Sequence, residues 1–244
     1  ELGREQARRT GRWFHQQQIE ISTVLSSPLS RAMDTASIIA DVAGYSKPQT
    51  MESIKEIDTG VFEGLSFREI RDRHPRVFGE FVVNSWESVP NAERSDSLIA
   101  RALDSWNQMV TLANRGNRAV LAVTHGGMIQ WIIKTSYGAE ASQPHRWMPI
   151  SKASNCGVFL IQIRPVEGSN GTTGVPERGY YAQWTILNHT PGADPEMGEQ
   201  IHTDRFLGNL DEVRVSRELV APKWQLHNVG MIVNTFDNTH DYKA

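Results

Sequence analysis

Three short motifs place residues capable of phosphate chemistry where a strand ends or a helix begins. The first contains Arg31, within Ser26-Ser-Pro-Leu-Ser-Arg-Ala at the predicted start of a helix. A helix N-terminus carries partial positive charge and disfavours an arginine, so Arg31 makes sense there if it faces a bound anion beside free backbone N–H groups. A solvated arginine is the alternative for this motif taken alone.

The second motif is Thr124-His-Gly-Gly, which directly follows the apolar run Ala119 to Val123. Glycine lets the backbone approach a ligand closely, and a histidine here can donate a hydrogen bond to a phosphoryl oxygen. A lone histidine is more often structural. The glycines at a strand-to-helix turn favour a ligand-binding role for His125 and Gly126.

The third motif is the loop Glu56-Ile-Asp-Thr-Gly-Val-Phe-Glu-Gly, in which acidic residues alternate with glycine. Acidic loops are usually solvated. A carboxyl group held near an anion site would instead have a raised pKa, and could protonate a leaving alcohol. Glu56 is therefore a candidate general acid.

Alternating helices and strands must position these motifs. Helix patterns cover residues 4–18, 66–74, 95–114 and 128–138. A further helix is predicted to begin with Ser27 as its N-cap and Pro28 as its first residue, and to end at Gly44. Strand patterns cover residues 23–26, 51–57, 119–123, 157–164 and 180–187, the last two predicted to form a hairpin at one sheet edge. The alternation predicts an α/β fold, with a largely parallel sheet covered by helices on both faces.

The pattern changes after Pro191-Gly192. We expect a domain over residues 1–191 and an irregular C-terminal extension over residues 192–244, with one clear strand at Leu210 to Val215.

Composition excludes several classes of function. The 244 residues carry a net charge of −3, which gives no electrostatic basis for binding nucleic acid or an anionic membrane. No apolar run approaches the roughly 20 residues of a membrane-spanning helix. Cys156 is the only cysteine, so neither an intrachain disulfide nor a thiolate metal cluster can form. We expect a cytoplasmic protein without a metal.

Taken in order, the motifs resemble those of the histidine phosphatase (phosphoglycerate-mutase-like) superfamily, over about Glu1 to Thr190. The opening Glu-Leu-Gly-Arg-Glu-Gln-Ala resembles the segment that follows the family's N-terminal Arg-His-Gly signature. The resemblance implies that Arg31 grips phosphate, that Glu56 donates a proton, and that His125 contacts the phosphoryl group with Gly126 beside it. It also implies a small phosphorylated substrate and no cofactor.

One departure from the family pattern concerns the nucleophile. The family's nucleophile is the histidine of an Arg-His-Gly triplet ending the first, central strand, and this sequence contains no such triplet. We expect an N-terminally trimmed chain with negligible activity, whose sheet shows a gap or a substitute strand. The only spare apolar candidate, Met231-Ile-Val, brings Asn234-Thr-Phe where Arg-His-Gly is required. None of the remaining histidines lies at a glycine-rich strand end; they are His15, His74, His145, His189, His202, His227 and His240.

Three functions follow from these motifs. The first is a phosphatase that hydrolyses a phosphate monoester through a phosphohistidine intermediate in the intact protein. A phosphoglycerate-type phosphomutase is the near alternative, ranked second because the acid motif looks more like that of the phosphatase branch. A non-catalytic module that binds phosphate or sugar is the third. Substrate identity and oligomeric state stay open.

The tail has a weaker resemblance of its own. Phe206-Leu-Gly-Asn-Leu-Asp-Glu-Val-Arg-Val-Ser, followed by Ala221-Pro-Lys-Trp, looks like the closing strand of laminin-G or concanavalin-like sandwiches. About 50 residues cannot build a two-sheet sandwich. We favour a strand and loops that pack on the phosphatase domain.

Overall fold

The computed structural model describes residues 1–114, 119–136, 153–165, 180–192 and 229–234 of the chain. The helices and strands, with three short 3₁₀ helices marked η, are α1 Leu2–Gln16, β1 Ile21–Ser26, α2 Ser30–Ala43, β2 Gln49–Thr50, η1 Glu52–Ile54, η2 Gly60–Phe62, α3 Phe67–Arg73, α4 Pro75–Asn84, η3 Ser85–Ser88, α5 Ser95–Asn114, β3 Ala119–Thr124, α6 Gly126–Ser136, β4 Val158–Pro165, β5 Tyr180–His189 and β6 Val229–Asn234.

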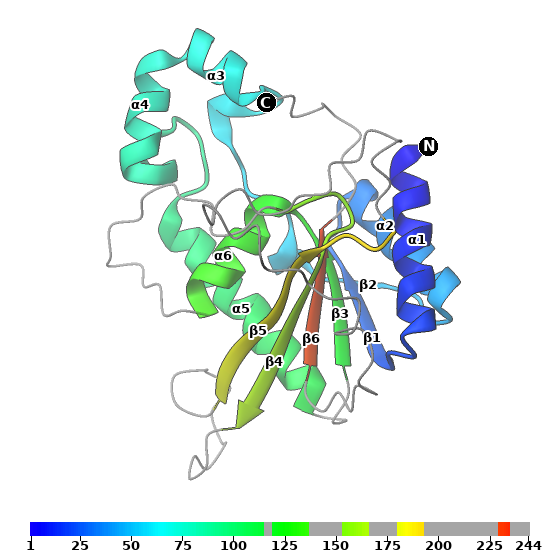
Figure 1. Ribbon diagram of the computed structural model, residues 1–244. Coiled ribbons are helices and arrows are strands. Elements are labelled where there is room, and N and C mark those ends of the chain that lie inside the picture. Colours follow the sequence, from blue (N-terminus) through cyan, green and yellow to red (C-terminus); the bar gives the residue numbers. More distant parts are fainter. Residues whose placement is uncertain (115–118, 137–152, 166–179, 193–228, 235–244) are drawn as a thin grey trace, which may run out of the picture.

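One sheet with the order β2-β1-β3-β6-β4-β5 organises the molecule (Figure 1). β2, β1, β3 and β6 are parallel neighbours, whereas β4 is antiparallel to both β6 and β5. Of the described strands, β4 alone runs against the others. The predicted α/β fold is confirmed, and so is the antiparallel pair at one edge of the sheet.

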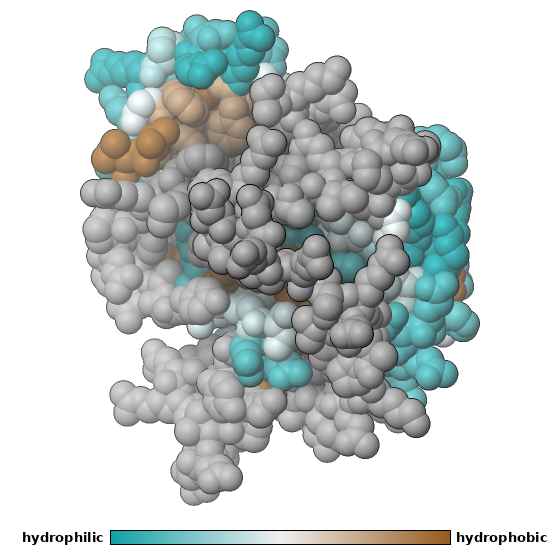
Figure 2. All heavy atoms as spheres, in the orientation of Figure 1, coloured by the Kyte–Doolittle hydropathy of each residue, from teal (hydrophilic) through white to brown (hydrophobic). Residues whose placement is uncertain are grey.

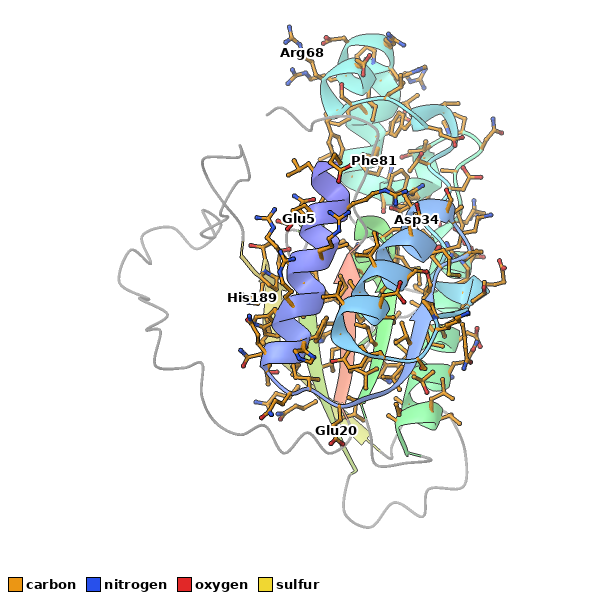
Figure 3. All side chains as sticks on the ribbon, turned by 90° about the vertical axis from the view of Figure 1, so that its right-hand side faces the viewer. Glu5, Glu20, Asp34, Arg68, Phe81 and His189 are labelled. Atoms are coloured by element: carbon orange, nitrogen blue, oxygen red, sulfur yellow. The ribbon has the colours of Figure 1, made fainter. Side chains whose placement is uncertain are left out.

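Helices cover both faces of the sheet, and β3 shows why its sequence is apolar throughout. Val120 and Ala122 pack in the core beneath α5 and α6, while Leu121 and Val123 pack in the core beneath α1 and α2. Successive side chains of a strand point to opposite faces, so a strand buried on both faces needs an unbroken apolar run. Figure 3 shows α1 and α2 together on one face.

The middle of the sheet is completed by a strand from the end of the chain. β6 lies between β3 and β4, and its register with β3 runs from Val120 opposite Gly230 to Thr124 opposite Asn234. Ile232 and Val233 are fully buried, one in each core. The spare apolar segment Met231-Ile-Val is thus part of a central strand of this sheet, and whether it replaces another strand stays a prediction. Residues 229–234 thus lie in the same sheet as the strands of residues 1–191.

The strand predicted over residues 51–57 is wrong. Only Gln49–Thr50 pair with β1, and the chain then turns through η1. Met51, Ile54 and Ile57 are all buried in one core. Their spacing of three residues matches a turn of 3₁₀ helix and cannot place all three on one face of a strand.

The start of α2 also differs from the prediction. Leu29, rather than Ser27, is the N-cap, and Pro28 lies outside the helix. The backbone N–H of Ser27 donates to the carbonyl of Val123 at 3.0 Å, which continues the pairing of β1 with β3 by one residue. A residue held in the sheet this way cannot open the helix. The predicted cap of the next short helix is confirmed, because Ser66 and Glu69 form a capping box at the start of α3.

The helices α3 and α4 lie beyond one end of the sheet, the end at which the parallel strands finish (Figure 1). Figure 2 shows an apolar area over this part of the surface, where Phe67, Val82 and Val83 are exposed. No helix among the described residues is long and apolar enough to cross a membrane. The strand predicted at Leu210 to Val215, and the tail resemblance, lie outside the described residues.

Candidate active site

Three of the four predicted site residues come from three segments that meet at the carboxyl ends of β1 and β3, and the fourth, Gly126, is the first residue of α6. Arg31 is the second residue of α2, Glu56 follows η1, and His125 joins β3 to α6. Arg31 lies close enough to influence the pKa of both Glu56 and His125. Parallel α/β sheets place their ligand sites at this edge, because loops from neighbouring strands open there.

Glu56 lies against the N-terminus of α6. Its Oε1 accepts the backbone N–H of Ile57 at 3.0 Å, and a Cβ atom added to Gly127 would lie 2.7 Å from the same oxygen. Burial raises the pKa of Glu56, opposed by the N–H groups of Ile57, Met128 and Gly127 and by the charge of Arg31. A carboxyl group whose pKa is raised holds its proton more readily, as a general acid requires.

His125 is buried and neutral. Burial, together with the nearby charges of Arg31 and Arg101, lowers its pKa to about 3. Its Nε2 atom lies 2.8 Å from Oγ of Ser27, a hydrogen bond between the ends of two adjacent strands. A neutral imidazole has one N–H, so it can offer one hydrogen bond to an anion.

Arg31 is the cation of this group. It is partly buried, and its guanidinium makes no hydrogen bond or ion pair with any residue in the described part of the chain. Burying a guanidinium without a partner costs free energy. Two of its N–H groups can donate at the same time to two oxygens of a phosphoryl group. The geometry suits an anion bound beside Arg31.

Two further residues, neither of them predicted as a site residue, hold residues 53–55, the segment that leads into Glu56 and that we call, with the loop after it, the acid loop. Arg101, from α5, donates through Nη1 to the carbonyls of Lys55 and Ser53 at 2.8 and 3.3 Å. Its other nitrogens, Nε and Nη2, contact the two carboxylate oxygens of Glu93 at 2.7 and 2.5 Å. Thr124 adds a hydrogen bond from Oγ1 to the carbonyl of Ile54 at 2.6 Å. These bonds fix Glu56 relative to α5 and β3.

The signal for Arg101 was present in the sequence but ambiguous. It lies beside the apolar residues Leu98 and Ala102 of an amphipathic helix, where arginine is most often solvated. Two of its partners are the carbonyls of Lys55 and Ser53, 46 and 48 residues away in the chain. No local pattern reports such a distant backbone contact.

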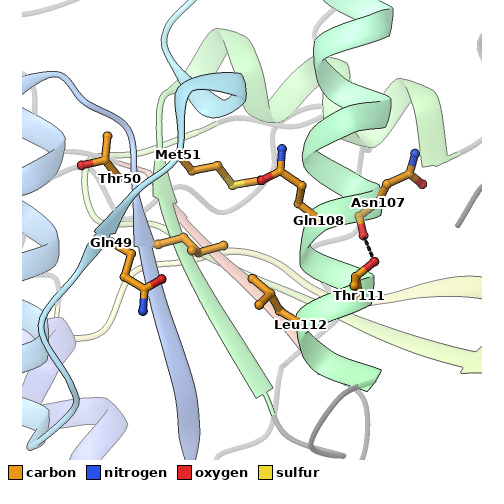
Figure 4. A pocket seen from close by; sticks show the side chains of 8 residues that line it. Gln49, Thr50, Met51, Asn107, Gln108, Thr111 and Leu112 are labelled. Carbon is orange, nitrogen blue, oxygen red and sulfur yellow. Dashed lines mark hydrogen bonds between the residues drawn. The ribbon is translucent and has the colours of Figure 1, made fainter.

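A separate pocket of about 410 Å³ lies between β2 and α5 (Figure 4). It is lined by Leu25, Gln49, Thr50, Met51, Asn107, Gln108, Thr111 and Leu112. None of Arg31, Glu56 and His125 lines it, and its polar groups are uncharged. Among the described residues, no group of three His, Cys, Asp or Glu side chains is placed to hold a metal ion.

The fold is an α/β domain in which an arginine, a histidine and a carboxylic acid lie near one another, and the family follows from comparison with known proteins. Residues 1–169 match the histidine phosphatase superfamily (branch 1). The chain belongs to that superfamily.

Curated relatives include both mutases and phosphatases. The chain is 29% identical over 140 residues to a 2,3-bisphosphoglycerate-dependent phosphoglycerate mutase of Methylorubrum extorquens, covering 54% of this chain and 64% of that protein. It is 28% identical over 180 residues to an acid phosphatase of Mycobacterium tuberculosis, covering 72% of this chain and 81% of that protein. The chain thus spans less than two thirds of the length of the mutase.

Solved structures show the same fold. A mycobacterial hydrolase superposes with a TM-score of 0.64 at 19% identity, covering 82% of this chain and 86% of the other. A mycobacterial glucosyl-3-phosphoglycerate phosphatase with inorganic phosphate superposes with a TM-score of 0.59 at 19% identity, covering 78% and 86%.

Proposed function

We propose that the site binds the phosphoryl group of a small phosphate monoester and serves hydrolysis through a phosphohistidine intermediate. The observation that carries the proposal is the position of Arg31, whose guanidinium lacks a partner among the described residues and lies near both Glu56 and His125. An anion would complete the guanidinium's hydrogen bonds and remove the cost of burying it alone.

Each residue has a distinct role in this proposal. Arg31 and His125 stabilise the charge that develops on the non-bridging oxygens during in-line displacement. Glu56, whose pKa is raised by burial, protonates the leaving oxygen. The backbone at Gly126 opens the approach to the phosphoryl group, because a glycine leaves space for the ligand.

The proposal assigns the nucleophile to no residue of the 244. The 244 residues contain no Arg-His-Gly triplet, and β6 brings Asn234 opposite Thr124, one residue before His125. Without a nucleophilic histidine the remaining groups can bind and polarise an ester but cannot form the covalent intermediate. We therefore propose that the 244-residue chain binds phosphate and hydrolyses monoesters negligibly.

The test measures binding and turnover separately on the 244-residue chain. Titration calorimetry with inorganic phosphate should show binding that falls about tenfold or more in Arg31→Ala. The matched control is Arg68→Ala on α3, an exposed arginine far from α2 (Figure 3). If Arg31→Ala bound inorganic phosphate as tightly as the unchanged chain, Arg31 would not be the residue that binds phosphate. Phosphohistidine trapped during turnover would disprove the proposed lack of hydrolysis.

A phosphomutase is the second candidate, because the relative from Methylorubrum extorquens carries a mutase name. The two functions differ in what happens to the phosphoryl group, which passes to water in a phosphatase and returns to the substrate in a mutase. A colorimetric phosphate-release assay, run beside an assay for bisphosphate-primed isomerisation on the full-length gene product, separates them. Binding of phosphate without either activity would favour a non-catalytic module.

A cytoplasmic location stays a prediction.

A further inference from the structure

The second half of the acid loop is paired with residues 89–93, the segment that leads from η3 to α5. The backbone N–H of Glu93 donates to the carbonyl of Asp58 at 2.9 Å, and the backbone N–H of Val61 donates to the carbonyl of Pro90 at 3.1 Å. An antiparallel bridge lies between these two hydrogen bonds. The acid loop is therefore tied by its backbone to the segment that enters α5.

Gly60 lies where the two segments approach each other most closely. Its φ is +56°, and a Cβ atom there would lie closer than 3.0 Å to backbone atoms of Pro90, Asn91 and Ala92. Because these are backbone atoms, no side-chain rotation can relieve the contact. The N–H of Gly60 also donates to Oδ1 of Asp58 at 2.8 Å, which holds the turn of the loop. Only glycine allows the segments to pair at this distance.

The same segment also holds the chain that precedes Glu56. The carboxylate of Glu93 accepts from Nε and Nη2 of Arg101 at 2.7 and 2.5 Å. Nη1 of the same guanidinium donates to the carbonyls of Ser53 and Lys55. Glu93 thus fixes the loop after Glu56 through its backbone, and the chain before Glu56 through Arg101.

We propose that Gly60 is a positioning residue for the candidate acid, because its close contact with residues 89–93 fixes the loop that keeps Glu56 buried beside α6. This inference rests on the proposed function only in giving Glu56 the role of the acid. Burial is what raises the pKa of Glu56, and the charge of Arg31 opposes it. If the loop moved away from residues 89–93, water would reach the carboxyl group and Glu56 would lose its proton at lower pH.

Gly60→Ala tests this role on the 244-residue chain, and Gly64→Ala is the matched control. Gly64 also has a positive φ, +73°, but a Cβ atom there would have nothing within 4 Å. Both alanines therefore strain the backbone, and only Gly60→Ala adds a clash. Hydrogen exchange at the amides of Val61 and Glu93, which bond across the two segments, should quicken about tenfold or more in Gly60→Ala and less than about threefold in Gly64→Ala.

The second measurement is the pKa of Glu56, followed by ¹³C NMR of its carboxyl carbon and assigned with Glu56→Gln. It should fall toward the ordinary value of a glutamate in Gly60→Ala, because the loop no longer excludes water, and stay raised in Gly64→Ala. Faster exchange with an unchanged pKa of Glu56 would mean that Gly60 serves the fold alone, and would overturn the inference. The same changes in both glycine variants would also overturn it.

A further pair of variants decides the question if Gly60→Ala does not fold. Asp58→Ala and Asp58→Asn remove the same negative charge, but only asparagine keeps a side-chain oxygen that can accept the N–H of Gly60. Asp58→Ala should quicken exchange and lower the pKa of Glu56 relative to Asp58→Asn. No difference between the two would overturn the inference. Absence of phosphate binding in the unchanged chain would instead sink the proposed function, while exchange and the pKa of Glu56 would still decide the role of Gly60.

Discussion

Close contact between Gly127 and the acid loop makes glycine necessary at that position. A Cβ atom there would lie 2.7 Å from Oε1 of Glu56 and 2.9 Å from Cδ1 of Ile57. Gly127→Ala should therefore displace Glu56 and reduce the free energy of unfolding by about 1–3 kcal/mol, as measured by urea denaturation.

Gly79 provides the control, because it lies inside α4 and a Cβ atom added there would have nothing within 4 Å. Gly79→Ala should be neutral or stabilise by up to about 1 kcal/mol, since alanine is the better helix former. Equal destabilisation by both alanines would show that Gly127 does not crowd Glu56.

Burial of neutral His125 should make the protein less stable in acid. Its pKa falls from an ordinary value of 6.5 to about 3 in the folded chain, so the unfolded state binds the proton more tightly. The contribution is fully present above about pH 6.5 and is lost as the pH falls toward 3. Between pH 7.5 and 4.5, the chain should lose about 2–3 kcal/mol more stability than His125→Asn.

Urea denaturation of both proteins at the two pH values checks this prediction. Carboxyl groups titrate in both and cancel in the comparison, including Glu56, whose raised pKa acts in the opposite direction. Parallel loss of stability in the two proteins would mean that His125 is not held neutral by the fold.

At the scale of elements, Arg101 attaches the acid loop to α5. The side chains of Arg101 and Glu93 are only 22% and 16% exposed, and two loop carbonyls complete the donors of Arg101. Arg101→Met would leave the largely buried Glu93 carboxylate without its cation and with only the hydrogen bond from Ser97 Oγ, at a cost of about 3 kcal/mol. Hydrogen exchange should also quicken over residues 51–60, because the loop loses its anchor.

Arg76→Met on α4 is the comparison, since the Arg76 side chain is 91% exposed and pairs only with Glu80 in the next turn among the described residues. A surface pair of this kind contributes at most about 1 kcal/mol. If Arg101→Met changed neither stability nor exchange beyond Arg76→Met, the loop would be held by other contacts.

At the scale of the whole molecule, β6 is an inner strand of the sheet that comes from a distant part of the chain. It supplies hydrogen bonds to β3 on one side and β4 on the other, and buries Ile232 completely. Ile232→Ala should cost about 2–4 kcal/mol, because a central strand has no room to relax around the cavity. Leu187→Ala on the edge strand β5, where the side chain is 46% exposed, should cost less than about 1 kcal/mol.

Thermal and urea denaturation of the two variants give the comparison. Similar small losses in both would place β6 outside the stable core of the sheet. A large loss of stability in Ile232→Ala alone would show that the strands on either side of β6 depend on it. Without β6, the facing edges of β3 and β4 would be unpaired and exposed.

Local patterns in the sequence determined most elements, and they nominated Arg31, Glu56 and His125, whose roles stay predictions. The apolar run at β3 required burial on both faces, and Ser66 predicted the start of α3. These predictions succeeded because propensity, capping and side-chain period act over a few residues.

Only the tertiary structure decided how distant segments combine. It replaced the predicted strand at 51–57 with η1, moved the start of α2 past Ser27, and put β6 at the centre of the sheet. It also revealed Ser27 beside His125 and Arg101 beside the acid loop. Each of these depends on a contact between residues tens of positions apart, and short-range periodicity carries no information about which distant partner a residue will meet.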